Sequence, residues 1–444
     1  MPLNVPPIAM PKGRLIMIGA GVVLVLVIVL GFLGVIPLFQ NKGPSDPNFP
    51  TGKVALTMWG TEPMTSFQEV LKTYQAQYPT VTITYVQQDA SGYEQKLVTA
   101  MAQGKGPDIF EINNLWVPEY NGIMAPTAVL PVGSSAMVTP QMMAAAFPGV
   151  VSGDFVQNGS VYASPLYLDA LALYYNKDIF NANGIVAAPA TWDDFIADVN
   201  KVKQITPAKT LILSGAAMGG SQNVSHATDI LSALMLQGGG RINGGQNGTV
   251  RFDDRATQAL GFYAQFADPV GVNYSWNSSF PDSRTAFIQG KTAMVVDYAD
   301  FRSAIQKQNP FFNFGVAPLP QLAGAAASDM ATFGRYAGLA VGAQSQNKYA
   351  AWSFIKFLTF TPSVSSVYLA ASGHLPALTS LIGQGLGGDD DVFLKSFLIA
   401  KTWQEPNESQ TASILSDAID NVVTGKMDAG RALNAAQEAI NGLW

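Results

Sequence analysis

The chain contains no cysteine and only two histidines among its 444 residues. A disulfide, a thiolate metal site and a lipid attached through cysteine are therefore all excluded. The two histidines, His226 and His374, lie far apart in the sequence, and no His-Glu-x-x-His stretch is present. Two histidines without cysteine cannot form a structural zinc site. We therefore expect neither a metal centre nor a cofactor.

Charged residues are few, and they form no pattern typical of catalysis or of nucleic-acid binding. The chain has 25 basic and 31 acidic residues and a net charge of −6, without the Lys and Arg clusters of a nucleic-acid groove. The stretch Gly219–Asn223 lacks the second glycine of a Gly-x-Ser-x-Gly elbow. The acidic run Asp389–Asp391 fits a solvated loop and helix cap, with a calcium site as the alternative. We do not expect an enzyme.

One long apolar segment stands near the N-terminus. Residues 15–39 contain no charged side chain, and 25 residues suffice to cross a bilayer as a helix. Lys12 and Arg14 precede it, which places residues 1–14 in the cytoplasm and the rest of the chain on the extracytoplasmic side. We predict an uncleaved transmembrane signal anchor; the alternative is a cleaved signal peptide, whose apolar region is usually shorter. Residues 40–52 contain three prolines and read as an extended linker.

After the linker, strand and helix patterns alternate. We expect strands at 53–59, 81–86 and 109–112, with helices at 64–78 and 93–103 between them. This order predicts a parallel sheet with helices on its faces. The chain is too long for one ordinary core, so two lobes are expected.

The rest of the chain repeats the mixed pattern. Thr191 followed by Asp194 predicts a helix that starts with a cap close to a capping box. A second helix is expected at 255–266, capped by Asp253 or Asp254, and the chain beyond Lys348 reads as mostly helical. Further strands are expected at 169–175, 249–252, 293–297, 314–318 and 338–341.

The stretch Gly104–Trp116, GKGPDIFEINNLW, invites comparison with a phosphate-binding loop. The Walker pattern needs its glycines after a strand and before a helix, whereas here they follow a helix and precede a strand. We therefore read Gly104 or Gly106 as the left-handed residue that ends a helix, and Pro107 as the residue that stops it. The polar and aromatic tail then lies where the strand ends.

In open parallel sheets, ligands bind beyond the carboxyl ends of the strands. The residues expected there mix aromatic rings with amides and carboxylates, and they include no cluster of Lys or Arg. That mixture suits a sugar, because rings pack on its C–H faces while polar groups bond its hydroxyls. Each aromatic residue has core packing as its alternative, and Asn113 with Asn114 has a turn. The collected residues are Trp59–Glu62, Gln88, Asp89, Tyr93, Asn113, Asn114, Trp116, Tyr167, Asp169, Asp297, Tyr298, Arg335 and Tyr336.

From residue 53 to 444, the chain resembles the extracellular solute-binding proteins of ATP-driven (ABC) importers, and within them the sugar-binding, maltose-binding-protein-like group. The resemblance rests on the order and spacing of several stretches rather than on any one of them. They are Trp59, Tyr78-Pro79, Gly104–Trp116, Tyr174–Asp178, Thr191–Asp194, Ile288–Arg302, Gly315–Pro320, Ala350–Phe360 and Gly373–Pro376.

The resemblance implies a type II periplasmic-binding-protein-like α/β fold, in which two lobes joined by a hinge close over a ligand. Lobe 1 would comprise residues 53–168 and 320–372, and lobe 2 residues 169–319 and 373–444. The implied protein is a monomer that delivers a carbohydrate to the membrane subunits of an ABC transporter. Carried over by position, the ligand-binding residues would be Trp59, Glu62, Asp89, Asn114, Trp116, Asp169, Tyr298 and Tyr336.

Two alternatives remain open at the level of sequence. A protein of the same fold could bind a solute other than a sugar, or serve a sensory partner. An extracellular carbohydrate enzyme would need two carboxylates about 5–10 Å apart across a cleft, and Glu62 and Asp169 are the candidates.

Overall fold

The structure is a computed structural model that describes residues 49–208, 210–240, 242 and 249–444. The predicted cytoplasmic segment 1–14, the predicted anchor 15–39 and residues 40–48 of the linker lie outside the described residues. Within the described part of the chain, no single helix is long and apolar enough to cross a membrane. One helix pair, α13 (Lys348–Phe360) with α14 (Pro362–Ser372), passes that test together by length and composition, but the two are bent by 79° at their junction. Residues 50–444 form one compact unit.

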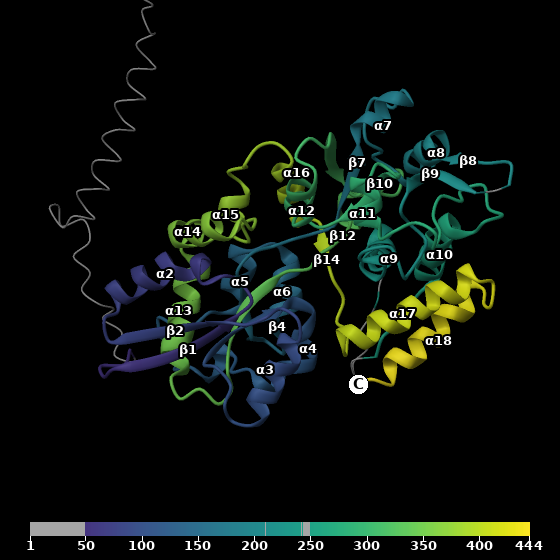
Figure 1. Ribbon diagram of the computed structural model, residues 1–444. Helices are drawn as coiled ribbons and strands as arrows, with labels where there is room; N and C mark the ends of the chain where they lie inside the picture. Colours follow the sequence, from purple (N-terminus) through teal and green to yellow (C-terminus); the bar gives the residue numbers. More distant parts are fainter. Residues whose placement is uncertain (1–48, 209, 241, 243–248) are drawn as a thin grey trace, which may run out of the picture. The chain divides into compact units, whose positions relative to one another are not determined.

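The first sheet carries the parallel strands expected from the sequence. Its strand order is β2-β1-β3-β13-β6, in which β1 pairs in parallel with both β2 and β3, whereas β13 runs antiparallel to β3 and β6. Helices α2, α13 and α14 pack around it, and we call this part of the molecule lobe 1 (Figure 1). The strands are β1 Val54–Gly60, β2 Val81–Gln87, β3 Ile109–Asn113, β6 Ala163–Pro165 and β13 Ala337–Val341. The helices are α2 Met64–Gln77, α3 Tyr93–Ala102, α4 Val117–Tyr120, α5 Pro140–Ala146, α6 Gly149–Phe155, α13 Lys348–Phe360 and α14 Pro362–Ser372.

Apolar spacing explains why α2 forms where it does. Phe67, Val70 and Tyr74 recur at helical spacing and are all buried, with exposures of 1% or less. The helix ends before Pro79, which cannot continue a helix.

The glycines after α3 end a helix, as the sequence predicted. Gly104 has a φ of +69°, and the amides of Gly104 and Lys105 donate to the carbonyl oxygens of Met101 and Ala100. This left-handed turn satisfies carbonyl groups that the helix leaves unpaired. At Gly106 a Cβ would lie 2.2 Å from the Met101 sulfur, so a larger residue there would displace the Met101 side chain. The phosphate-loop interpretation is thereby excluded.

The second sheet organises the other half of the fold, which we call lobe 2. Its strand order is β11-β7-β10-β9-β8, and β7 runs antiparallel to both β11 and β10. Helices α17 and α18, yellow in Figure 1, pack against each other and on α10. The strands are β7 Ala172–Asn176, β8 Gln204–Ile205, β9 Leu211–Ala216, β10 Thr292–Asp297 and β11 Phe314–Pro318. The helices are α7 Lys177–Ala182, α8 Trp192–Val202, α9 Ala227–Leu236, α10 Asp254–Ala264, α11 Ser283–Ile288, α12 Phe301–Gln308, α16 Asp390–Phe397, α17 Glu408–Val423 and α18 Ala429–Asn441. The short helix α15 Thr379–Ile382 stands between α14 and α16 in the sequence.

The prediction of a strand at 249–252 is wrong, because the structure has no strand there. The amide of Val250 donates to the side-chain oxygen of Asn441, and the amide of Phe252 donates to that of Gln437 at 2.7 Å. Because side chains of α18 satisfy these donors, the β-branched and aromatic residues pair with no neighbouring strand. The helix that follows starts as predicted, with the Asp253 carboxylate accepting from the amides of Arg255 and Ala256.

Extended segments carry the chain between the two sheets. The amide of Leu168 donates to the Leu375 carbonyl at 3.3 Å, and the amide of Leu171 donates to the Phe333 carbonyl at 3.0 Å. The return to lobe 1 runs through β12, Thr332–Phe333, and on to β13, whereas Pro320 still accepts a bond from Gln237 of lobe 2. The short strand β14, Ala400–Lys401, pairs with β12. The two-lobed α/β architecture is therefore present, while the expected residue boundaries of the lobes stay a prediction.

The start of α8 provides a test of local stability. The Thr191 hydroxyl accepts from the Asp194 amide at 3.2 Å, and the Asp194 carboxylate accepts from the Thr191 amide, which completes a capping box. Thr191→Ala should lower the free energy of unfolding by about 1 kcal/mol, because a helix amide loses its partner. Urea unfolding measures this, with Asp193→Ala in the same turn as a control expected to cost about half as much. An unchanged midpoint for Thr191→Ala would contradict the capping role.

Candidate ligand-binding site

The site is built where the strands of lobe 1 end, beside the segments that cross to lobe 2. Trp59 is partly exposed near the end of β1, and the Lys96 ammonium lies 5.7 Å from the centre of its ring. The loop after β1 is held by Glu111, whose carboxylate accepts from the amide and the hydroxyl of Thr61, both at 2.9 Å. Asp89 is exposed after β2, and its carboxylate accepts from the Ser91 amide at 2.9 Å. Its contact with a ligand stays a prediction.

Asn114 and Tyr336 belong to a buried polar cluster around Asp154. The Asp154 carboxylate accepts from the Asn114 amide group at 2.9 Å and from the Tyr336 hydroxyl at 2.6 Å, and it also accepts from Thr402. Asn114 and Tyr336 are each 1% exposed. In this arrangement both side chains fasten lobe 1 to the crossing segments, and their expected role in ligand binding stays a prediction.

The cluster predicts an unusual pH dependence of stability. Burial raises the pKa of Asp154 to about 6, although bonds from Thr402, Tyr336 and Asn114 favour its charged form. Because the pKa of Asp154 is higher in the folded protein than in the unfolded chain, the folded protein favours the protonated carboxyl. The stabilisation that this preference gives is present at low pH and is lost as pH rises through about 6. We expect the free energy of unfolding of the wild type, relative to Asp154→Asn, to fall by about 2 kcal/mol between pH 4.5 and pH 7. Urea unfolding of both proteins at both pH values tests this, and parallel pH profiles would contradict it.

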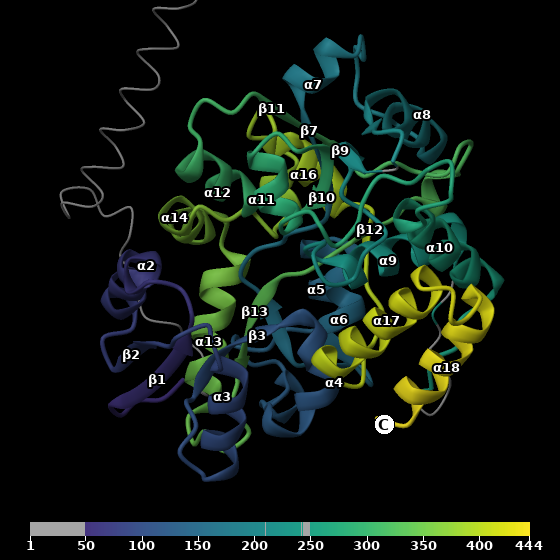
Figure 2. The ribbon, with the colours of Figure 1, turned by 45° about the vertical axis from the view of Figure 1, so that its right-hand side comes forward.

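A charged network joins lobe 1 to the N-terminal end of α17. The Arg335 guanidinium donates to both carboxylate oxygens of Asp229, at 3.1 and 3.2 Å, and also to Glu408. Glu408 in turn accepts from the indole of Trp116, which lies in the 3₁₀ turn after β3. Asn407 donates to Glu119 of α4 at 2.8 Å, and Figure 2 shows the start of α17 beside α4. Trp116 is thus held by a partner from the far end of the chain.

Lobe 2 contributes a second group of ring and charge contacts. The Tyr298 hydroxyl donates to Asp229 at 2.8 Å, and the tyrosine itself is 4% exposed. Burial opposes ionisation of Asp229, but Arg335 and His226 outweigh it and hold the pKa of this carboxyl below its usual value. Arg284 pairs with Asp297 at 2.6 Å. Asp229 and Asp297 are therefore ionised, and each is paired with an arginine.

His226 holds an uncommon backbone conformation at the start of α9. Its φ is +60°, in the left-handed region that non-glycine residues seldom adopt. The ring packs edge-on against Tyr298, with centroids 4.8 Å apart, and its nitrogens face Asp229 and Asp297. Such strain persists only where surrounding contacts enforce it, and it is common at binding sites.

A cavity of about 260 Å³ opens beside this network. Of the residues that line it, only Arg335 was collected from the sequence, as a residue before a strand, and the ligand-binding set implied by the resemblance did not include it. The others come from the loop before α9, from the first turn of α9 and from α17, where no strand end marks them. Its lining includes Ser221, Val224, His226, Asp229, Arg335 and Ser416.

Asp169 and Glu62 lie along the crossing segments. The Asp169 carboxylate accepts from the amides of Ala170 at 2.8 Å and Ala299 at 3.0 Å, so it links the first crossing to lobe 2. Burial, together with the charge of Asp300, raises the pKa of Asp169 to about 7, even though the Ala299 amide favours its charged form. Glu62 bonds the imidazole Nε2 of His374 at 2.7 Å.

The arrangement offers paired charges, rings and hydroxyl-bonding groups. Among the described residues, no group of three or more His, Cys, Asp or Glu side chains is placed to hold a metal ion. In the acidic run, Asp390 pairs with Arg302, and Asp391 accepts from the amides of Leu386 and Gly387. Asp390 and Asp391 bind protein groups and are the first two residues of α16 rather than part of a loop, and Asp389 before them makes no side-chain cap bond.

Sequence comparison finds a family and several relatives. The profile of the family described as "Bacterial extracellular solute-binding protein" matches residues 59–363. A relative named a putative binding protein, from Brucella abortus, is 27% identical over 70% of this chain and 72% of its own length. A Streptococcus pneumoniae relative is named a maltooligosaccharide ABC transporter solute-binding lipoprotein. It is 26% identical over 87% of this chain and 88% of its own length.

Solved structures share the fold at low identity. A cyclo/maltodextrin-binding protein complexed with maltotetraose has a TM-score of 0.70 and 19% identity, covering 88% of this chain and 97% of the other. The sugar-binding protein MalE from Xanthomonas citri has a TM-score of 0.70 and 21% identity with the same coverage. At such identities the likeness establishes the fold alone, which is the two-lobed fold predicted from the sequence.

Proposed function

We propose, because the chain belongs to the family of bacterial extracellular solute-binding proteins, that it captures a sugar or oligosaccharide between its lobes and delivers it to an ABC importer. The observation that carries this proposal is the set of groups between the lobes. Trp116 from lobe 1, Asp169 from the first crossing, and Arg335 of the return crossing with Asp229 of lobe 2 combine a ring with hydrogen-bonding charges. The basic groups of the network are paired with carboxylates, which disfavours an anion and suits a neutral, hydroxyl-rich molecule.

The relatives support the choice of carbohydrate. The pneumococcal relative is named for maltooligosaccharide, a Streptomyces coelicolor relative for diacetylchitobiose and a solved structure for its bound maltotetraose. These names describe those proteins. The named ligands are all carbohydrates, but they are not one and the same sugar. The proposal for this chain is therefore carbohydrate as a class.

Closure of the lobes would couple binding to delivery. A ligand that touches both lobes only in the closed form shifts the population toward that form. Trp116 and Glu408 already join the two sides through one hydrogen bond. A transporter could then recognise the ligand-bound protein by its closed shape and tell it from the empty protein.

The N-terminal segment would keep the protein at the membrane. Residues 15–39 have the length and composition of a single-pass anchor, and the chain has no cysteine for a lipid. The binding domain would then work as a tethered extracytoplasmic monomer. Fractionation of cells expressing the full chain tests this: the protein should stay in the membrane fraction through a high-salt wash, and release by salt would contradict the anchor.

Tryptophan fluorescence of the purified full chain tests the choice of ligand. Titration with maltose, maltotriose, diacetylchitobiose, mannobiose and tagatose should change the emission for at least one sugar, because Trp59 and Trp116 are partly exposed at the site. A matching rise in melting temperature should accompany binding. A response to a polyamine, peptide or anion with none to any sugar would favour the same-fold alternative for another solute.

The enzyme alternative has its own test. Glu62 is paired with His374, and Asp169 accepts two backbone amides, so both carboxylates have structural partners. Incubation with each oligosaccharide should leave it intact. Hydrolysis that disappears in Glu62→Gln would revive the enzyme.

A further inference from the structure

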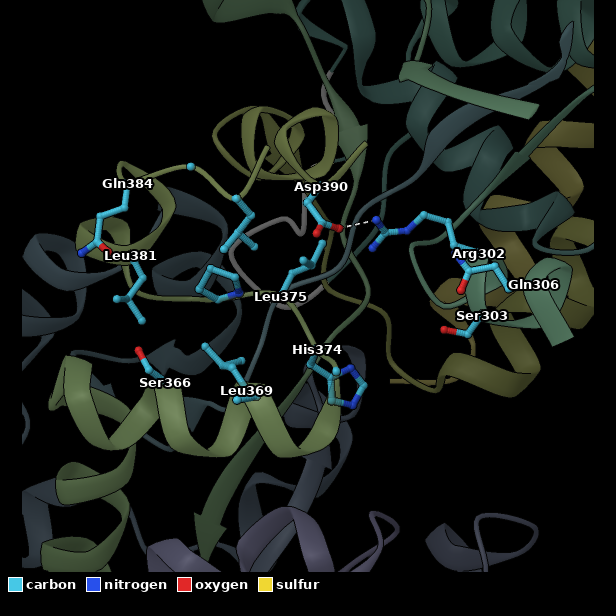
Figure 3. A pocket seen from close by; sticks show the side chains of 15 residues that line it. Arg302, Ser303, Gln306, Ser366, Leu369, His374, Leu375, Leu381, Gln384 and Asp390 are labelled. Atoms are coloured by element: carbon cyan, nitrogen blue, oxygen red, sulfur yellow. Dashed lines mark hydrogen bonds and ion pairs between the residues drawn. The ribbon is translucent and has the colours of Figure 1, made fainter. Parts of the chain in front are cut away.

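A second and larger cavity borders the site at His374. It has a volume of about 550 Å³, within the range of small-molecule sites. One wall is α12 of lobe 2, and another is α14 of lobe 1. The crossing segment 373–376 and the loop before α16 complete it, as Figure 3 shows. A molecule in this cavity would touch both lobes.

The walls of the cavity offer no unpaired charged side chain among the lining residues. Three lining side chains can carry charge, and each is paired: Arg302 with Asp390, and His374 with Glu62. The Arg302 guanidinium also lies 5.0 Å from the centre of the Phe393 ring, which fixes it further. An incoming anion or cation would have to break one of these pairs.

The remaining walls combine aliphatic surface with hydroxyl and amide groups. Leucines and a proline supply the apolar part, and serines and glutamines supply donors and acceptors. This combination matches the C–H faces and hydroxyls of a saccharide unit. Examples are Leu369, Leu375 and Pro376 among the apolar residues and Ser303, Gln306 and Gln384 among the polar ones.

The cavity and the site share two walls. The His374 ring lines the cavity while it bonds Glu62 and stacks on Tyr167, with centroids 3.7 Å apart and planes 5° apart. On the other side, Arg302 donates to the Ala299 carbonyl, and the Ala299 amide donates to Asp169. The cavity walls His374 and Arg302 are therefore in contact with Glu62 and with the backbone that holds Asp169.

We infer that this cavity holds the end of an oligosaccharide whose first units lie beside Asp169 and Glu62, so that the protein takes chains of three or more units. This inference rests on the proposed function and narrows its ligand class. Each unit placed there adds contacts to α12 and α14 together. Affinity should therefore rise with chain length.

Substitutions on α14 test the inference with a matched control. Ala370 lines the cavity and is exposed, so Ala370→Trp fills the space without disturbing a core. Val367 is 43% exposed on the same helix and is not among the lining residues, so Val367→Trp controls for the added ring. Gln306→Ala removes a wall group on the opposite lobe with little steric change.

The full chain and the three variants are titrated calorimetrically with two- and three-unit probes of the same linkage: maltose and maltotriose, di- and triacetylated chito-oligomers, and mannobiose and mannotriose. For at least one linkage, the wild type and Val367→Trp should bind the three-unit probe about tenfold tighter than the two-unit probe. Ala370→Trp should lose that advantage while keeping its affinity for two units, and Gln306→Ala should reduce the advantage.

The outcomes separate the two proposals. Equal affinities of the wild type for two and three units, or an advantage that survives in Ala370→Trp, would overturn the inference and leave carbohydrate binding in place. Failure of the wild type to bind any of the six probes would count against the proposed function, and the inference would fall with it.

Discussion

Replacing Arg335 with methionine is expected to lower the free energy of unfolding by about 3 kcal/mol. The guanidinium bonds both oxygens of Asp229, which is 5% exposed, and also reaches Glu408. Its removal leaves a buried carboxylate without its main counter-charge, and such a charge is costly. The crossing before β13 and the start of α17 should both loosen.

Urea unfolding of the full chain at pH 7 measures the effect, and Arg431→Met supplies the control. Arg431 pairs with Asp428 on the surface, where the two side chains are 71% and 65% exposed, so its loss should cost less than about 1 kcal/mol. In the double variant Arg335→Met/Asp229→Asn, much of the lost stability should return, because the buried charge is gone. Equal costs for Arg335→Met and Arg431→Met would contradict the network described here.

Replacing Asp169 with asparagine is expected to weaken saccharide binding by about 100-fold. The carboxylate is held by the Ala170 and Ala299 amides, so its orientation is fixed before a ligand arrives. A fixed carboxylate accepts strong bonds from sugar hydroxyls. Asparagine keeps the shape but replaces one acceptor with a donor and removes the charge.

The same carboxylate should make binding depend on pH. The pKa of Asp169 is raised to about 7, chiefly by burial, and hydroxyl donors favour the charged form. Affinity should therefore be full at pH 8 and fall as pH drops below 7, while Asp169→Asn should bind weakly and equally across that range. Calorimetric titration at pH 8 and 5.5 tests this, with Asp193→Asn as a surface control that should behave as the wild type does. A flat profile for the wild type would contradict a direct role for Asp169.

The sequence predicted those parts of the fold that local patterns determine. Apolar spacing located α2, the paired residues Thr191 and Asp194 located the start of α8, and Gly104 located the end of α3. These signals are local because each depends on hydrogen bonds or packing within a few residues. The failure at 249–252 has the opposite cause, since its amides are bonded by side chains of α18 far along the chain.

The site was harder to predict because its residues, too, are bonded by partners that lie far away in the sequence. Trp116 could be chosen because it follows a strand pattern and Asp169 because it begins one at the expected crossing, but their partners could not be predicted. Glu408 lies 292 residues from Trp116, and the position of Arg335 gives no hint that it bonds Asp229. Only the folded chain brings these charges together, and the cavity at His374 likewise depends on two helices from different lobes.

The most direct test of the central claim is a crystal structure of the protein with the saccharide that binds most tightly in the titrations. We expect density for the sugar between the lobes, with a ring packed on Trp116 or Trp59 and a hydroxyl bonded to Asp169. A sugar bound on the outer surface of one lobe, with no contact to Asp169 or to Trp116, would contradict the claim that the space between the lobes is the binding site.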